Sequence, residues 1–232
     1  MENSSITIKP IARIRTAFPE KFGLPRQSML VPSLTGTIIF DKEFRDPNAF
    51  RGLEDYSHLW LIWMFSESVC DHWSPTVRPP RLGGNTRMGV FATRSPFRPN
   101  PLALSCVKIE SIDLHTDNGP VITVSGIDMK DNTPIYDIKP YVRYADCRPH
   151  AVCGYVDGLP DERLKVIFPE AMSGRIGDKT VIPSLIEVLK LDPRPSYHND
   201  PEREYGLSFA GHNVRFRVVE DVLEVIDVER IK

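Results

Sequence analysis

The sequence predicts a mainly β protein, with an antiparallel β-barrel core and a small C-terminal α+β domain. Three observations support this class. Short β-branched segments recur at near-regular spacing up to Tyr141, they are separated mostly by turns with few long helices, and amphipathic helical spacing appears after Tyr141. Such a pattern is typical of an antiparallel barrel or sandwich. A hydrophobic content of 41% in 232 residues is enough for a core of this kind.

The first strands are expected near the N-terminus. An isoleucine-rich segment interrupted by Pro10 has extended character, and the β-branched run 35–40 follows a turn region at 32–34. Asp46 and Pro47 suit the cap and the first position of a short helix over 46–54. The isoleucines of the first segment are Ile6, Ile8, Ile11 and Ile14.

The most apolar run, LWLIWMF, is expected to form a core strand buried on both faces within residues 56–65. It is far too short to span a bilayer, so no membrane partner is expected. Residues 88–93 predict another short strand.

A hairpin is expected after the proline-rich end of residues 78–101. Residues 102–114 and 121–127 are extended segments, and the Asp-Asn-Gly-Pro sequence between them has the chemistry of a hairpin turn. A further turn at Asp131 and Asn132 leads to the last strand of this half, over 135–138.

The second half begins with helical patterns. Residues 161–168 and 180–191 have the apolar spacing of amphipathic helices, and Pro183 lies near the start of the second helix, where proline is tolerated. The sequence DPRP ends that helix. Three strands are then expected at 205–209, 214–219 and 222–228. We therefore predict a β-barrel domain over 1–150 and an α+β domain over 155–232.

Charge and cysteine content limit the classes of partner. The chain has 29 Lys and Arg against 31 Asp and Glu, so any RNA contact must come from a local patch rather than from the overall field. Four cysteines without a CxxC pair, and no secretory signal, predict a reduced cytoplasmic location. Cys147, His150 and Cys153 lack an evident fourth ligand for a zinc site, and no metal is expected.

Residues 78–101 are the region around which the chain is organised. They contain five arginines and no acidic residue, so these charges are solvated, paired with distant carboxylates, or used to hold an anion. Three prolines stiffen the end of the region, and a polyproline II conformation would bring Arg94, Phe97 and Asn100 to one side. Gly83 and Gly84 allow a bend. The arginines are Arg78, Arg81, Arg87, Arg94 and Arg98.

The motif GVFATRSPFRPNP, with VRPPRLGGN before it and DIKPY after it, resembles the TsaA-like (TrmO-type) family of β-barrel, S-adenosylmethionine-dependent tRNA methyltransferases. The chain is similar to bacterial enzymes that methylate N6 of N6-threonylcarbamoyladenosine at position 37 of tRNA. This resemblance implies the same activity, S-adenosyl-L-methionine as cofactor, the tRNA anticodon loop as partner, and a homodimer. The residues alone do not suggest this cofactor, because no GxGxxG sequence follows a strand and opens a helix.

The resemblance also implies a cofactor site. Ser66 and Glu67 occupy the place of a His-Gln pair in related bacterial proteins, which is a departure from the family pattern. By composition alone, Leu104 is an ordinary core residue. The implied set is Pro25, Arg26, Gln27, Ser66, Glu67, Arg94, Leu104, Asp131, Asn132, Thr133 and Pro134.

A general base is the least determined part of the implied reaction. The acceptor nitrogen is conjugated with the adenine ring and a carbamoyl group, so removing its proton requires a positioned base or the substrate's own groups. Asp137 and Asp131 are the carboxylates nearest to the motifs and are the candidates. Asp137 could instead pair with an arginine of residues 78–101. His58 is expected to be a hydrogen-bonded barrel residue rather than a catalyst.

RNA contacts are expected from two regions. Arginines of residues 78–101 could bind phosphates while Phe97 stacks on an exposed base, as in the recognition of single-stranded loops. Arg215 and Arg217 would share one face of a strand, which could hold tRNA or be an ordinary solvated basic face. The candidates are Arg78, Arg81, Arg87, Phe97, Arg98, Arg194, Arg215 and Arg217.

Two other functions remain open at this point. The protein could methylate a small molecule or another nucleotide, with the arginines holding a phosphate or carboxylate. It could also be a non-catalytic RNA-binding module with a vestigial cofactor site, which the departure at Ser66 and Glu67 leaves possible.

Overall fold

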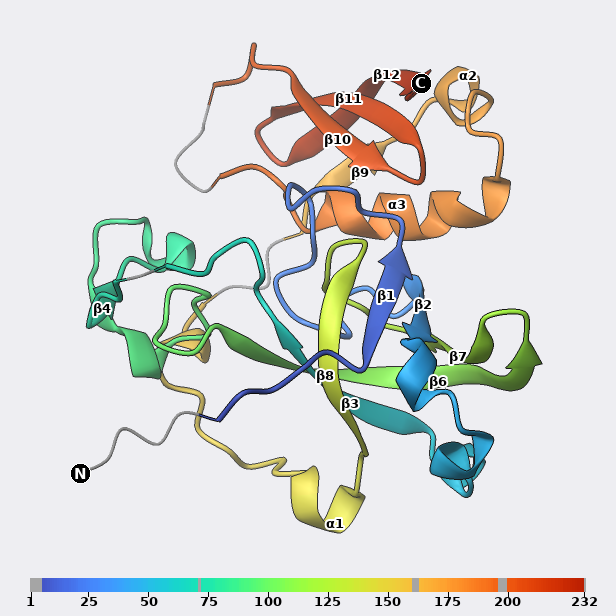
Figure 1. Cartoon of the computed structure of the whole chain (residues 1–232). Helices are drawn as coiled ribbons and strands as arrows, with labels where there is room; N and C mark the ends of the chain where they lie inside the picture. The colour runs from blue at the N-terminus through green and yellow to red at the C-terminus, as the bar shows by residue number, and fades with distance from the viewer. Residues whose placement is uncertain (1–5, 71, 160–162, 196–199, 232) are drawn as a thin grey trace.

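The computed structural model describes residues 6–70, 72–159, 163–195 and 200–231. Its larger part is a closed six-stranded barrel in which all neighbouring strands are antiparallel (Figure 1). The order around the barrel is β1 (Ala12–Thr16), β2 (Thr35–Phe40), β7 (Gly119–Ser125), β6 (Leu102–Thr116), β3 (His58–Met64) and β8 (Thr133–Pro140). The predicted antiparallel barrel is confirmed.

Alternating burial along the strands fills the barrel. In β3, Leu59, Leu61 and Trp63 are buried, whereas the residues between them are half-buried. The prediction of a strand buried on both faces is therefore wrong, because a closed barrel has one interior face and an outer face that other segments cover only in part. Other fully buried strand residues include Ile14, Ile38, Val107, Ile122 and Ile135.

The N-terminal expectations are met in part. Strand β1 begins at Ala12, whereas Ile6 and Ile8 lie outside any strand and are exposed. The expected helix over 46–54 is replaced by two 3₁₀ turns, η2 (Pro47–Phe50) and η3 (Leu53–Asp55). As expected, the Asp46 side chain caps the first of them by accepting a hydrogen bond from the Asn48 N–H at 2.9 Å.

Residues 78–101, the arginine-rich region, begin within a small two-stranded ribbon. Strands β4 (Thr76–Val77) and β5 (Met88–Gly89) pair antiparallel, and the 3₁₀ turn η4 (Pro80–Leu82) lies between them. Gly83 and Gly84 have φ values of 73° and 72°, so the predicted glycine bend is confirmed. The strand expected over 88–93 is shorter than predicted, because its second part is the 3₁₀ turn η5 (Val90–Ala92).

The C-terminal part is a four-stranded sheet with helices, which confirms the α+β class predicted for it. The strand order is β10 (Tyr205–Phe209), β11 (His212–Val219), β12 (Val222–Arg230) and β9 (Lys165–Ile167). Helix α3 (Ile182–Lys190) matches the helix predicted over 180–191. The remaining short elements are η1 (Lys42–Phe44), α1 (Arg143–Asp146), η6 (Gly154–Val156), α2 (Glu170–Ser173) and η7 (Lys179–Val181).

The helix predicted over 161–168 is wrong. Lys165–Ile167 instead form β9, which pairs parallel with β12. Leu164, Val166 and Phe168 are half-buried, whereas Lys165 and Ile167 are exposed. That alternation has a period of two, so pairing with β12 determines the conformation.

Helix α3 lies between the barrel and the C-terminal sheet (Figure 1). Leu185, Val188 and Leu189 are buried, and the Ser184 hydroxyl lies 3.0 Å from both Ser33 O and Ser33 Oγ in the loop before β2. The segment after β1 also reaches the sheet, since Phe18 contacts Phe209 and Phe22 stacks on Phe216, with ring centroids 5.1 Å and 6.5 Å apart. The barrel and the sheet therefore share one apolar core.

Among the helices of the described residues, none combines the length and the apolar character needed to cross a membrane.

Candidate active site

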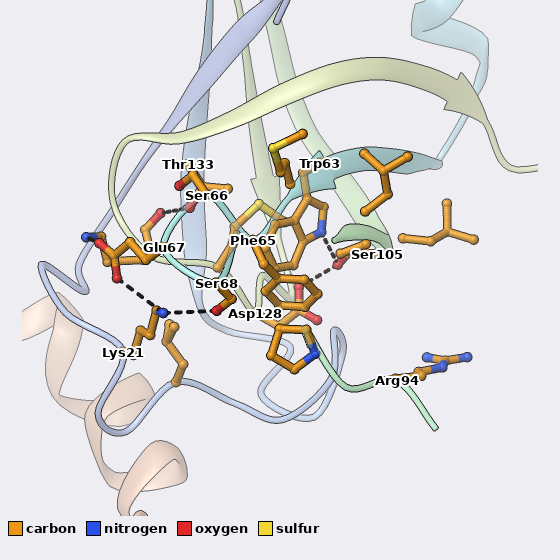
Figure 2. A pocket seen from close by; sticks show the side chains of 18 of the residues that line it. Lys21, Trp63, Phe65, Ser66, Glu67, Ser68, Arg94, Ser105, Asp128 and Thr133 are labelled. Carbon is orange, nitrogen blue, oxygen red and sulfur yellow. Dashed lines mark hydrogen bonds and ion pairs between the residues drawn. The ribbon is translucent and has the colours of Figure 1, made fainter. Parts of the chain in front are cut away.

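A cavity of about 860 Å³ opens at the end of β3, where the chain leaves the barrel (Figure 2). Four segments distant in sequence line it: the loop before β2, the end of β3 with the residues after it, the proline-rich region with the start of β6, and the loop before β8. The pairing register of β3 with β8 shifts between Ile62 and Trp63. Such a bulge re-aims side chains, and Ile62, Trp63 and Met64 all line the cavity.

Most of the side chains that the family resemblance implied meet here. They come from three loops, from β6 and from the first residue of β8, so only the closed barrel brings them together. The cavity is lined by Pro25, Arg26, Gln27, Ser66, Glu67, Arg94, Leu104 and Thr133. Asp131, Asn132 and Pro134 are outside its described lining.

Leu104 is not a core residue, although composition alone predicted one. Its exposed fraction is 53%, while the next residue, Ser105, is buried. Alternation along β6 directs Ser105 to the barrel interior, so Leu104 faces outward and contributes apolar surface to the cavity.

Hydrogen bonds within residues 78–101 fix the backbone beside Arg94, and Gln27 binds its side chain. Thr93 accepts from Ser95 N at 3.3 Å through its hydroxyl and from Arg98 Nη1 at 3.2 Å through its carbonyl. The Arg94 guanidinium donates to Gln27 Oε1. Arg94, Phe97 and Asn100 all line the cavity, but so do Pro96 and Arg98 between them, so the cavity does not select one side of the segment.

Glu67 is held by two lysines. It forms an ion pair with Lys130 and a second, at 3.4 Å, with Lys21, and the hydrogen bond from Lys130 lowers the pKa of Glu67. Lys21 also donates to Ser68 Oγ at 3.3 Å. The position that departs from the family pattern therefore carries a charge that its neighbours neutralise.

A hydrogen-bonded chain that the sequence did not predict lies at the centre of the cavity. Trp63 Nε1 donates to Ser105 Oγ at 2.9 Å, and Ser105 Oγ donates to Asp128 Oδ1 at 2.7 Å (Figure 2). Burial raises the pKa of Asp128 to about 6, although the hydrogen bond from Ser105 acts in the opposite direction. The only sequence signal was the position of Asp128 three residues before the Asp131 turn.

The two predicted catalytic carboxylates have partners on the barrel strands. Asp131 Oδ1 accepts from Thr16 N at 2.9 Å and lies 3.0 Å from Arg15 Nε. Asp137 pairs with Lys139 at 3.0 Å rather than with an arginine of the proline-rich region. Neither is among the described residues that line the cavity, because Asp131 turns back onto β1 and Asp137 lies along β8.

The loop geometry at Asn132 agrees with the turn that was expected. Asn132 has φ of 63°, its N–H donates to Ile14 O at 2.8 Å, and its carbonyl accepts from Arg13 Nη1 at 3.0 Å. Asparagine tolerates this left-handed conformation, so it suits the turn.

A second cavity, of about 1490 Å³, shares lining residues with the first, including Arg26, Gln27 and Arg94. None of its described lining residues is acidic. Trp73 and Phe91 lie 5.9 Å apart at its wall and are 51% and 71% exposed. The arginines that line it are Arg26, Arg78, Arg81, Arg87, Arg94 and Arg98.

Arg26 joins the two cavities. Its Nη2 donates to Asp192 O at 3.5 Å, which ties the loop before β2 to the segment after α3. Burial lowers the pKa of Arg26, and the nearby charge of Arg81 lowers it further. A bound anion would therefore stabilise the charged form of Arg26.

The arginines predicted in the C-terminal part are all paired with acidic residues. Arg194 binds Asp192 at 2.9 Å through both Nε and Nη2. Arg217 lies 2.8 Å from Glu224. Arg215 lies 2.8 Å from Glu204 and 3.5 Å from Asp227. These ion pairs reduce the positive charge that this face presents.

The described part of the chain contains no group of three or more His, Cys, Asp or Glu side chains placed to hold a metal ion. His58 Nδ1 is hydrogen-bonded to Ser57 Oγ at 2.8 Å, as expected for a barrel residue.

Two family models match the chain: the tRNA-methyltransferase O N-terminal domain over residues 13–147 and the TrmO C-terminal domain over residues 161–231. The tRNA (adenine(37)-N6)-methyltransferase of Escherichia coli (strain K12) is 39% identical over 233 residues, covering 97% of this chain and 99% of that protein. A Pseudomonas aeruginosa (strain PAO1) protein named "Putative S-adenosylmethionine-dependent methyltransferase RcsF" is 38% identical, covering 96% and 97%.

A crystal structure of TrmO from Pseudomonas aeruginosa superposes with a TM-score of 0.78 at 32% identity, covering 98% of this chain and 100% of that one. These matches agree with the resemblance carried by the motif GVFATRSPFRPNP. The chain belongs to the tRNA-methyltransferase O (TrmO) family.

Proposed function

We propose that this protein is an S-adenosyl-L-methionine-dependent methyltransferase that methylates N6 of N6-threonylcarbamoyladenosine at position 37 of tRNA. The full-length relative named as a tRNA (adenine(37)-N6)-methyltransferase supports the substrate class. The observation that carries the proposal is the continuity of two cavities, one holding the implied cofactor residues and the other lined by arginines, with Arg94 in both.

The smaller cavity has the size and chemistry for the cofactor. Its volume of about 860 Å³ lies within the roughly 300 to 1,000 Å³ of small-molecule sites. A positively charged sulfonium is favoured by aromatic faces, which Phe65 and Phe97 provide. When bound, S-adenosylmethionine supplies an electrophilic methyl carbon whose bond to sulfur breaks during transfer.

The chain's own residues hold and align the reactants. Arg94 and Gln27, joined by a hydrogen bond, would bind polar groups of the cofactor, and Leu104 would offer an apolar wall. Because a rigid loop and barrel strands carry these side chains, the acceptor nitrogen can be held in line with the methyl group.

The larger cavity has the positive charge and the aromatic surface to bind the anticodon loop. Its arginines can neutralise phosphates, and Phe97 together with the exposed Trp73 and Phe91 pair can stack on bases that leave the loop. The paired arginines of the C-terminal part are expected to contribute less, because acidic partners already neutralise them.

Further parts of the proposal concern organisation. Residues 1–150 would carry the cofactor site and the chemistry, and residues 155–232 would help to hold the tRNA. The protein would act in the cytoplasm as a homodimer, a state that sedimentation at micromolar concentration measures directly.

Mass spectrometry of nucleosides tests the function. Purified protein, S-adenosylmethionine and tRNA carrying threonylcarbamoyladenosine are incubated, and the tRNA is digested. A gain of one methyl group on that nucleoside is expected, with none on matched tRNA that lacks the threonylcarbamoyl group. Methylation of a different nucleoside would replace the substrate assignment. Cofactor that fails to bind in a calorimetric titration would leave the non-catalytic RNA-binding module as the better function.

A further inference from the structure

Asp128, in the loop between β7 and β8, lines the smaller cavity at a position that the family resemblance did not mark. In the view of Figure 2, the Lys21 and Glu67 pair lies on one side of Asp128 and Arg94 on the other. Burial raises the pKa of Asp128 to about 6, so this carboxylate can gain and lose a proton near neutral pH.

Hydrogen-bond direction determines how Asp128 is presented. An indole N–H can only donate, so Trp63 Nε1 donates to Ser105 Oγ, and the serine proton is then directed to Asp128 Oδ1. The serine hydroxyl therefore holds the carboxylate with Oδ1 as an acceptor, and the backbone of Ser28 and of Asp128 itself also favours the ionised form. These three hydrogen-bonded residues come from two strands, β3 and β6, and a loop, so the barrel itself orients the carboxylate.

Among the described residues, none of the other charged side chains around the cavity forms a direct ion pair with Asp128. Arg94 favours the ionised form of Asp128 through space, whereas Glu67 is already held by Lys21 and Lys130. The backbone of Ser28 also stabilises the ionised carboxylate. The charged side chains that line the cavity are Lys21, Arg26, Glu67, Arg94, Arg98 and Lys130.

We propose that Asp128 is the proton acceptor for the methylated nitrogen, with Ser105 and Trp63 as positioning residues; this inference rests on the proposed function. The N6–H proton passes to the Asp128 carboxylate, and the nitrogen lone pair forms the new bond to the methyl carbon. The electrons of the broken carbon–sulfur bond stay on sulfur, which becomes a neutral thioether. Asp128 then releases its proton to water. The role of Asp128 therefore requires an acceptor nitrogen that must lose its proton because its lone pair is conjugated.

Asp128→Asn tests the role directly, because asparagine keeps an oxygen that can accept from Ser105 but cannot take up a proton. The single-turnover methylation rate at saturating tRNA and cofactor is expected to fall by about 100-fold or more. The cofactor dissociation constant, measured by calorimetry, should change by no more than about threefold. Asp117→Asn, in the exposed β6–β7 turn, is the matched control and should retain the full rate.

The pH dependence of kcat/KM gives a second test, because a purely structural role of Asp128 would not change it. The kcat/KM for S-adenosylmethionine should rise with pH up to about pH 6 and then level. Ser105→Ala removes a hydrogen bond that favours the ionised carboxylate, so the rising limb should move to higher pH. Because Ser105→Ala alters only a hydroxyl, it also serves if Asp128→Asn does not fold.

Three results would overturn the role of Asp128: a wild-type rate in Asp128→Asn, a loss of cofactor affinity as large as the loss of rate, or an unmoved profile in Ser105→Ala. The second would identify Asp128 as a cofactor ligand instead. If wild-type protein methylates no adenosine in tRNA, the proposed function fails and the role fails with it. If the wild-type protein is active and one of the three results is found, the role of Asp128 fails while the proposed function stands.

Discussion

At the scale of single residues, Asp128 makes the stability of the fold depend on pH. Its pKa is about 6 in the folded chain, against 3.8 for an unperturbed aspartate, so between these values the folded chain binds more protons than the unfolded chain. Its contribution to the free energy of unfolding is therefore largest below about pH 4 and is lost as pH rises through about 6.

This effect can be measured without any substrate. Replacing Asp128 with Asn removes the titration, so the stability of wild type relative to the variant should fall by up to about 3 kcal/mol as pH rises from about 4 to 7. Urea unfolding at several pH values measures the difference. Asp117→Asn should show no comparable trend, and a constant difference between wild type and Asp128→Asn would contradict the shifted pKa.

Arg94 is the residue on which cofactor binding is expected to depend most. Arg94→Ala removes the guanidinium that donates to Gln27 and lines both cavities. Hydrogen bonds to a charged group are worth roughly 1.5 to 3 kcal/mol, so the affinity for S-adenosylmethionine should fall about 10-fold to 100-fold. Calorimetric titration measures this. Arg51→Ala, on the exposed end of η2, is the control, and an Arg94→Ala variant with unchanged affinity would remove Arg94 from the cofactor site.

At the scale of elements, the arginine-rich region and strand β11 differ in whether their arginines line a cavity or pair with acidic residues. Arg87 lines the larger cavity, whereas Arg217 forms a 2.8 Å ion pair with Glu224. Arg87→Ala should weaken tRNA binding and lower the slope of log affinity against log salt by about one. Arg217→Ala should change both much less. Filter binding over a salt series measures the two variants side by side, and equal losses would give β11 the same role in RNA binding as the arginine-rich region.

At the scale of the whole molecule, the shared core makes the barrel and the C-terminal sheet unfold together. Phe209, in β10, is buried against Phe18, which follows β1. Phe209→Ala should lower the free energy of unfolding by about 3 to 5 kcal/mol. All three tryptophans lie within residues 60–73, so their fluorescence reports on the barrel side of the molecule.

The coupling is tested by comparing two probes. Fluorescence and circular dichroism of Phe209→Ala should give the same shifted urea midpoint, because loss of packing in the sheet also weakens the barrel. An unchanged fluorescence midpoint with a shifted circular dichroism midpoint would show that the two parts unfold separately.

Local sequence patterns predicted those elements whose period is unambiguous. The run 35–40 and the three C-terminal strands alternate clearly, and the strands lie where they were expected. The segment 161–168 was misassigned because Leu164 and Phe168 fit a helical spacing as well as a strand alternation. Only pairing with β12 distinguishes the two, and that partner lies more than 50 residues later in the chain.

The sequence by itself determined the barrel class, the family motif, and most of the residues that meet at the smaller cavity, because these depend on local period and on motif identity. The tertiary structure alone decided which side chains face that cavity, which arginines are neutralised, and the chain from Trp63 through Ser105 to Asp128. Trp63 is 42 residues from Ser105, and Ser105 is 23 residues from Asp128. Burial and hydrogen bonding arise between segments so far apart, and they set the proton affinity of Asp128, which no local pattern encodes.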